Sequence, residues 1–105
     1  MGNRRPLAIQ WSVSSVNHLE QATGYIEADN VRAADTVRRR ILKSVRQLAD
    51  MPFIGHVGRI DGTREPVIYK TPYIVVYQVS SSAIEILGIW HTAREWPKSL
   101  ESWNL

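Results

Sequence analysis

Two dense apolar runs lie in the second half of the chain, at residues 73–79 and 83–90, and three serines separate them. Both runs are rich in β-branched and aromatic residues, and the gap has the length of a hairpin turn. Side chains of a strand alternate between its two faces, so Tyr73 and Val75 share one face while Ile74 and Val76 share the other. Apolar residues on both faces predict a hairpin that is covered on both sides and forms the centre of a sheet.

A short strand and two helices are predicted upstream of this hairpin. Residues 7–11 alternate as a strand, and after the three serines at positions 12, 14 and 15, which are plausible caps, Val16 begins a helical spacing that ends near Asp29. The strongest helical signal follows Asn30. There an apolar stripe runs over five turns, formed by Ala34, Val37, Ile41, Val45 and Leu48. So short a connection predicts that the two helices form an antiparallel hairpin.

One further strand is predicted at residues 64–69, after a glycine-containing loop. Pro66 cannot donate a hydrogen bond to a neighbouring strand, so this segment is expected at the sheet edge or at a bulge. The chain as a whole is expected to be one α+β domain over residues 1–105, with tails at 1–5 and 98–105. In it, an N-terminal strand and an antiparallel helical hairpin pack on a largely antiparallel four-stranded sheet, in the order β-α-α-β-β-β.

The composition narrows the possible chemistry. The chain has no cysteine, which excludes disulfides, thiolate catalysis and cysteine-ligated metals. His18 and His56 have no partner at ligand spacing, so we expect no metal and no cofactor. No apolar run approaches the ~18 residues of a membrane span, and no apolar segment follows the basic N-terminus as in a secretory signal. A cytoplasmic protein without a membrane partner is expected.

The positive charge is concentrated on the second predicted helix. The formal net charge is +3, and residues 30–50 hold six cations against two acids. Spacings of seven, four and three residues place four of the cations on one exposed line, which we call the basic ridge: Arg32, Arg39, Lys43 and Arg46. Two interpretations remain open, a solvated outer helix face or a surface that meets a polyanion or an acidic partner.

Three motifs resemble a known family. They are Gly-Thr-Arg-Glu from Gly62, Pro-Tyr-Ile-Val-Val-Tyr from Pro72, and Ile-Leu-Gly-Ile-Trp-His-Thr-Ala-Arg-Glu-Trp-Pro ending at Pro97. With the order of elements, they resemble the RelE/ParE superfamily of toxins from bacterial type II toxin-antitoxin modules, over Leu7 to Pro97. The resemblance implies a cognate antitoxin, whose acidic or amphipathic C-terminal segment wraps the toxin. It also implies one of two activities, cleavage of mRNA at the ribosome in the RelE branch or inhibition of DNA gyrase in the ParE branch.

The candidate site follows from the chemistry of metal-free RNA cleavage. That reaction needs an acid and a base, for which His91 is the candidate, since several nucleases of the superfamily carry a histidine at this strand end. It also needs cations to hold the phosphate, for which Arg64 and Arg94 are candidates, with Lys70 or Tyr73 assisting. The alternative role for His91 is structural, as a histidine that hydrogen-bonds a neighbouring loop.

The first functional hypothesis is therefore a toxin that arrests growth as a ribosome-dependent mRNA endonuclease. The alternative is a non-enzymatic inhibitor of DNA gyrase. Two departures from the nuclease pattern bear on the choice. Ile74 stands where those nucleases place a phosphate-binding arginine, and Trp96 stands where some have a late tyrosine.

Overall fold

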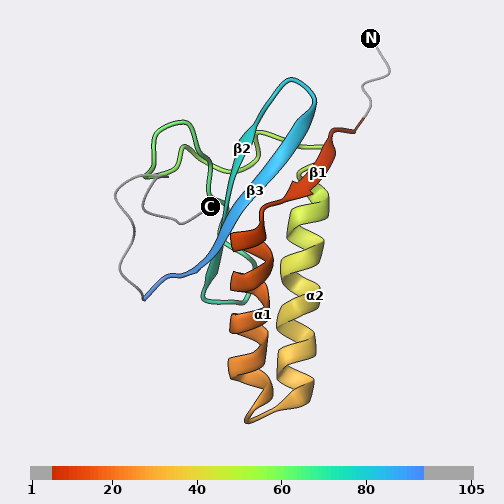
Figure 1. Ribbon diagram of the computed structural model, residues 1–105, viewed down its shortest axis with the longest axis vertical. Helices are drawn as coiled ribbons and strands as arrows, with labels where there is room; N and C mark the ends of the chain where they lie inside the picture. The colour runs from red at the N-terminus through yellow and green to blue at the C-terminus, as the bar shows by residue number, and fades with distance from the viewer. Residues whose placement is uncertain (1–5, 94–105) are drawn as a thin grey trace.

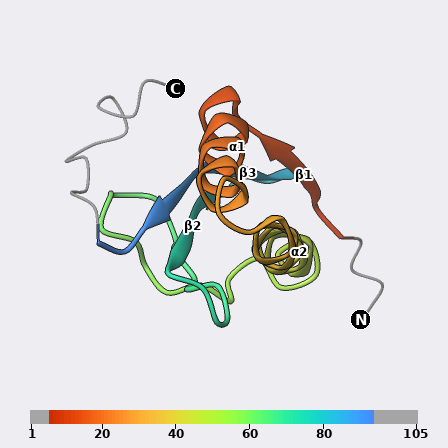
Figure 2. The same cartoon turned by 90° about the horizontal axis from the view of Figure 1, so that it is seen from below.

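Five regular elements make up the part of the chain that the computed structural model describes, residues 6–93. In chain order they are strand β1 (Ala8–Trp11), helix α1 (Val13–Glu27), helix α2 (Val31–Gln47), strand β2 (Tyr73–Val79) and strand β3 (Ala83–His91) (Figure 1). The helices lie side by side as a hairpin, whose turn projects beyond the end of the sheet. Figure 2, a view along the helix axes, shows both helices end-on and adjacent. The predicted α+β class and helical hairpin are confirmed.

The sheet has three strands in the order β1-β3-β2, and it is mixed. β2 runs antiparallel to β3, whereas β1 runs parallel to β3 and pairs Ala8 with Ala83. The predicted four-stranded, largely antiparallel sheet is therefore wrong in strand number and in the direction of β1. The alternation of residues 7–11 identifies a strand but contains no information on direction, because side chains alternate in both kinds of pairing.

Residues 64–69 lie along the outer edge of β2 without forming the predicted strand. Two isolated antiparallel bridges, at Arg64 and Val67, join this segment to β2. Between them the Pro66 carbonyl accepts a hydrogen bond from the Val75 N–H (3.2 Å), but the proline has no N–H to return. The missing donor explains why the edge strand is reduced to separate bridges.

Both helices begin at side-chain caps. Ser12 Oγ accepts a hydrogen bond from the Ser15 N–H (3.0 Å) at the start of α1, and Asn30 Oδ1 accepts one from the Ala33 N–H (3.0 Å) at the start of α2. Each cap satisfies one of the N–H groups that the first turn of a helix leaves without a partner. The caps thus fix where the two predicted helices start.

The main core lies between the helical hairpin and one face of the sheet. The predicted stripe contributes Ile41 and Val45 of α2 and Leu48, the residue that caps its C-terminus, and all three are buried against this face. The other buried members of the core are Ala22, Ile68, Tyr73, Val75, Tyr77, Ile84, Ile86 and Ile89. On α1, by contrast, Val16 is 40% exposed.

A bulge in β3 helps to cover the second face of the sheet. The register shifts between Val76 and Tyr77, which leaves Leu87 as an extra residue in β3. Leu87 then packs with Val76 and with Ile60 from the preceding loop in a small second cluster. Both faces are covered near the centre, as predicted. Within residues 6–93, no helix is long and apolar enough to cross a membrane.

Candidate functional site

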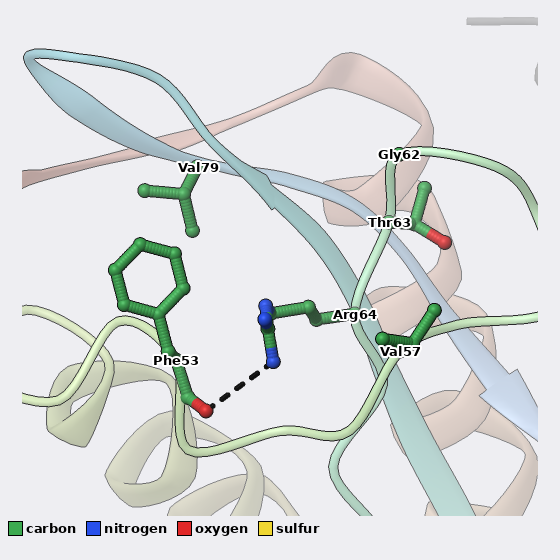
Figure 3. Close-up of a pocket in the computed structure, with 6 residues that line it drawn as sticks. All are labelled: Phe53, Val57, Gly62, Thr63, Arg64 and Val79. Atoms are coloured by element: carbon green, nitrogen blue, oxygen red, sulfur yellow. Dashed lines mark hydrogen bonds between the residues drawn. The ribbon is translucent and has the colours of Figure 1, made fainter.

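Arg64 lies at the outer edge of β2, and its side chain donates hydrogen bonds to the neighbouring loop. Its backbone exchanges two hydrogen bonds with Tyr77, at 2.8 and 3.0 Å. Its guanidinium donates from Nη1 to the carbonyl oxygens of Phe53 (3.4 Å) and Gly55, and lies 5.0 Å from the centroid of the Phe53 ring (Figure 3). Arg64, Phe53, Val57, Gly62, Thr63 and Val79 line a surface pocket of about 240 Å³. The position therefore makes Arg64 a loop anchor.

Tyr77 anchors the same loop from inside the core. Its fully buried hydroxyl donates to the Pro52 carbonyl (2.8 Å) and accepts from the Gly55 N–H (3.2 Å). Burial raises the pKa of the Tyr77 hydroxyl above its usual value, and the hydrogen bond from Gly55 and the charge of Arg64 oppose this rise only in part. The sequence places Tyr77 in the apolar run 73–79 but does not predict these bonds, because their partners lie in an irregular loop.

His91 is the last residue of β3 and lies directly opposite Tyr73 in β2. The two rings meet edge to face, with centroids 5.2 Å apart. Nδ1 of His91 accepts a hydrogen bond from the Ala93 N–H (3.0 Å). In a neutral imidazole one nitrogen accepts and the other donates, so this bond assigns the proton of neutral His91 to Nε2.

His18, which the sequence offered no reason to choose, lines the same pocket as His91. From α1 its Nδ1 accepts a hydrogen bond from the Ile89 N–H (3.2 Å), and its ring contacts Trp90 at 6.0 Å between centroids. His18 and His91 line one pocket of about 240 Å³ with Gln21, Ala22, Tyr73, Ile89 and Trp90. Because both Nδ1 atoms accept backbone N–H groups, the neutral rings present Nε2–H donors and not metal-binding lone pairs. Residues 6–93 contain no group of three or more potential metal ligands.

The structure does not bring Arg64 and His91 together. Arg64 is bridged to Tyr77, whereas His91 is paired with Tyr73. The two positions are four residues apart in β2, which is about 13 Å along the strand at the usual rise. Arg94, the other predicted phosphate clamp, lies outside the described residues.

The basic ridge is exposed over its whole length on α2, as predicted. Arg39 forms an ion pair with Asp35 (3.1 Å), one helical turn away. Beside the ridge, Nη1 of Arg40 donates to the carbonyl of Lys70 (3.2 Å), which joins α2 to the turn before β2. Lys70 thus lies near the helix cations, while Tyr73 lies at the histidine pocket.

Comparisons with known proteins identify the family. A family model described as the ParE toxin of the type II toxin-antitoxin system parDE matches residues 9–96. A curated candidate toxin of Sinorhizobium fredii, Y4kP, is 39% identical over 92 residues, covering 88% of this chain and 95% of the relative. A solved structure described as the chromosomal ParDE system from P. aeruginosa has the same fold, with a TM-score of 0.74, 17% identity, and coverage of 81% of this chain and 95% of that one. This chain therefore belongs to the ParE toxin family of type II toxin-antitoxin systems.

Proposed function

We propose that this toxin arrests growth by binding DNA gyrase, without cleaving a substrate. The observation that best supports the proposal is the placement of Arg64. Its Nη1 is bonded to two loop carbonyls, and its anchoring position lies about 13 Å along the strand from that of His91. Phosphoryl chemistry depends on charged groups that are held together around the reacting phosphate. Arg64 and His91 do not form such a pair at these positions.

The hydrogen bond at His91 supports the same proposal. A general base must offer an unprotonated nitrogen, yet Nδ1 accepts the Ala93 N–H and the neutral ring then has its proton on Nε2. To act as a general acid, His91 must first become an imidazolium ion. Its Nδ1 would then hold a proton that faces the Ala93 N–H. Either catalytic role would break this contact, so the bond fits the structural role better.

Ribosome-dependent mRNA cleavage remains the second candidate. The observation in its favour is the edge-to-face pair of Tyr73 and His91 beside a pocket at the strand end. This pair offers a phenol and an imidazole at one place. For cleavage, the Ala93 backbone would have to move away from Nδ1 before the imidazole could accept or donate a proton there.

One preparation tested in two assays separates these functions. We expect the chain to inhibit gyrase supercoiling and to create no new mRNA ends in a translation reaction mapped by primer extension. His91→Ala should change supercoiling inhibition by less than about fivefold, since most single interface contacts contribute under ~1 kcal/mol. New mRNA ends that His91→Ala reduces by ~10²–10⁴ would refute the proposal and establish the nuclease.

The cognate antitoxin is the second partner, and we propose the basic ridge as part of its docking surface. The ridge is exposed, and its net positive charge is complementary to an acidic segment. An extended line of cations on a rigid helix suits an amphipathic segment that lies along α2.

A further inference from the structure

The turn before β2 holds a lysine in an unfavourable backbone conformation. The turn is closed by hydrogen bonds from the Ile68 N–H to the Tyr73 carbonyl (3.0 Å) and from the Thr71 N–H to the Ile68 carbonyl (3.1 Å). Lys70 lies within it at φ 55°, the only positive φ of a non-glycine residue in the described chain. Glycine adopts this left-handed conformation without the steric cost that a side chain adds. Strained positions of this kind cluster at functional sites, so the lysine side chain is the feature to explain.

The contacts of this turn place the Lys70 side chain beside an aromatic ring and the Lys70 backbone against a second cation. Nζ of Lys70 lies 5.4 Å from the centroid of the Tyr69 ring, and Tyr69 is 73% exposed. Arg40 of α2 donates to the Lys70 carbonyl (3.2 Å), which holds the turn against the helix. The turn that carries the exposed ring and the ammonium group is therefore joined to α2 at Arg40.

Most of these cations have no acidic partner within residues 6–93. Arg39 is paired with Asp35, whereas no ion pair is found there for Arg40, Lys43 or Lys70. Adjacent cations that are not neutralised attract anionic ligands and raise their local concentration. A ligand with several negative charges in a row is the chemical class that such a surface fits.

We propose that the Lys70 turn and the neighbouring part of α2 bind a single-stranded nucleic acid. Phosphates would lie on Lys70 and the α2 cations, and an unstacked base would lie on the Tyr69 ring. Single-strand binding proteins combine these same two features, a positive track and an aromatic platform. An acidic peptide would use the charge but leave the exposed ring without a role, so the ring favours a nucleic acid. This site goes beyond the proposed function, since it would bind a nucleic-acid strand and not gyrase itself.

Fluorescence anisotropy of a labelled oligothymidylate, titrated with the full chain at increasing salt, tests the proposal without gyrase. Four phosphate contacts, by Lys70, Arg40, Arg39 and Lys43, predict a slope of roughly −3 in a plot of log affinity against log salt. Lys70→Gly should reduce the size of this slope by about 0.7. The same change should not lower the urea midpoint, because glycine suits the backbone at this position. Tyr69→Leu should weaken binding about tenfold.

Arg38→Gln is the matched control, because it also removes one charge. Arg38 lies two residues from Arg40 and therefore points to another side of α2. We expect it to leave the slope and the affinity unchanged. An oligouridylate tested in parallel separates RNA from DNA, and binding of either single strand supports the site.

Three results would overturn the proposal. The first is absence of oligothymidylate binding at low salt. The second is equal affinity for a duplex of the same length together with no effect of Tyr69→Leu, which would remove the base-stacking role. The third is equally tight binding of polyglutamate that Lys70→Gly weakens as much as it weakens oligothymidylate binding, which would make the Lys70 turn part of the acidic-peptide surface on the basic ridge.

Discussion

Replacing Tyr77 by phenylalanine would remove one buried hydroxyl and leave the ring in place. Pro52 and Gly55, both buried, would then lose the hydrogen bonds that they make to this hydroxyl at 2.8 and 3.2 Å. The ring volume is unchanged, so no large cavity forms, and the cost is that of two buried polar groups without a partner. At roughly 1–2 kcal/mol each, the expected loss is about 2–4 kcal/mol. This is a large fraction of the stability of a small domain.

Urea denaturation of Tyr77→Phe at neutral pH measures this loss. Tyr69→Phe is the matched control, because it deletes the same atom from a side chain that is 73% exposed. We expect the control to change the free energy of unfolding by less than about 0.5 kcal/mol. A similarly small loss in Tyr77→Phe would refute the argument that the hydroxyl holds the 52–55 loop to the core.

The Tyr77 hydroxyl also predicts that the free energy of unfolding depends on pH in the alkaline range. Since burial raises the pKa of Tyr77 in the folded state, the unfolded chain loses this proton first, near pH 10. The free energy of unfolding should therefore be unaffected by this group below about pH 10 and should fall as the pH rises further. Tyr77→Phe should remove this fall and Tyr69→Phe should retain it, as measured by urea midpoints across the alkaline range.

Four other changes test the packing and the partner surface. Ile41→Ala should lower the free energy of unfolding by about 2–5 kcal/mol in chemical denaturation, because Ile41 is fully buried between α2 and the sheet. Gly24→Ala should raise it by about 0.5–1 kcal/mol, since an added Cβ meets nothing within 4 Å on α1, whereas Gly58→Ala should lower it because the Cβ would collide with Thr63. Charge reversal at Arg39 and Lys43 should weaken antitoxin binding in calorimetry and reduce its salt dependence; unchanged affinity would contradict the docking role of the ridge.

The sequence was most informative where one local period repeated often. The stripe containing Ile41 and Val45 recurs along the whole of one helix, and the structure buries these two residues as expected. The direction of β1 and the fate of residues 64–69 depended on pairings with distant segments. Pro66 did reveal that its segment would pair poorly, because the missing N–H is a property of the residue itself.

The candidate site was harder to predict from the sequence, because it also depends on contacts between distant segments. Residue chemistry identified His91 and Arg64 as charged or titratable groups near strand ends, but the choice of hydrogen-bond partners decides what each can do. Arg64 bonds to the loop at Phe53, and the neighbour His18 reaches Ile89 across 71 residues of sequence. No spacing along the chain predicts such contacts.

The parallel pairing of β1 with β3 has a consequence for how the toxin is made. Ala8 pairs with Ala83, so the first strand has no sheet partner until the last strand has left the ribosome. Native contacts over such long separations form late and slowly, because the intervening chain must first be ordered. During synthesis the apolar side of the helical hairpin is therefore uncovered by its sheet. A binding surface built on the finished sheet can therefore form only after translation has passed β3.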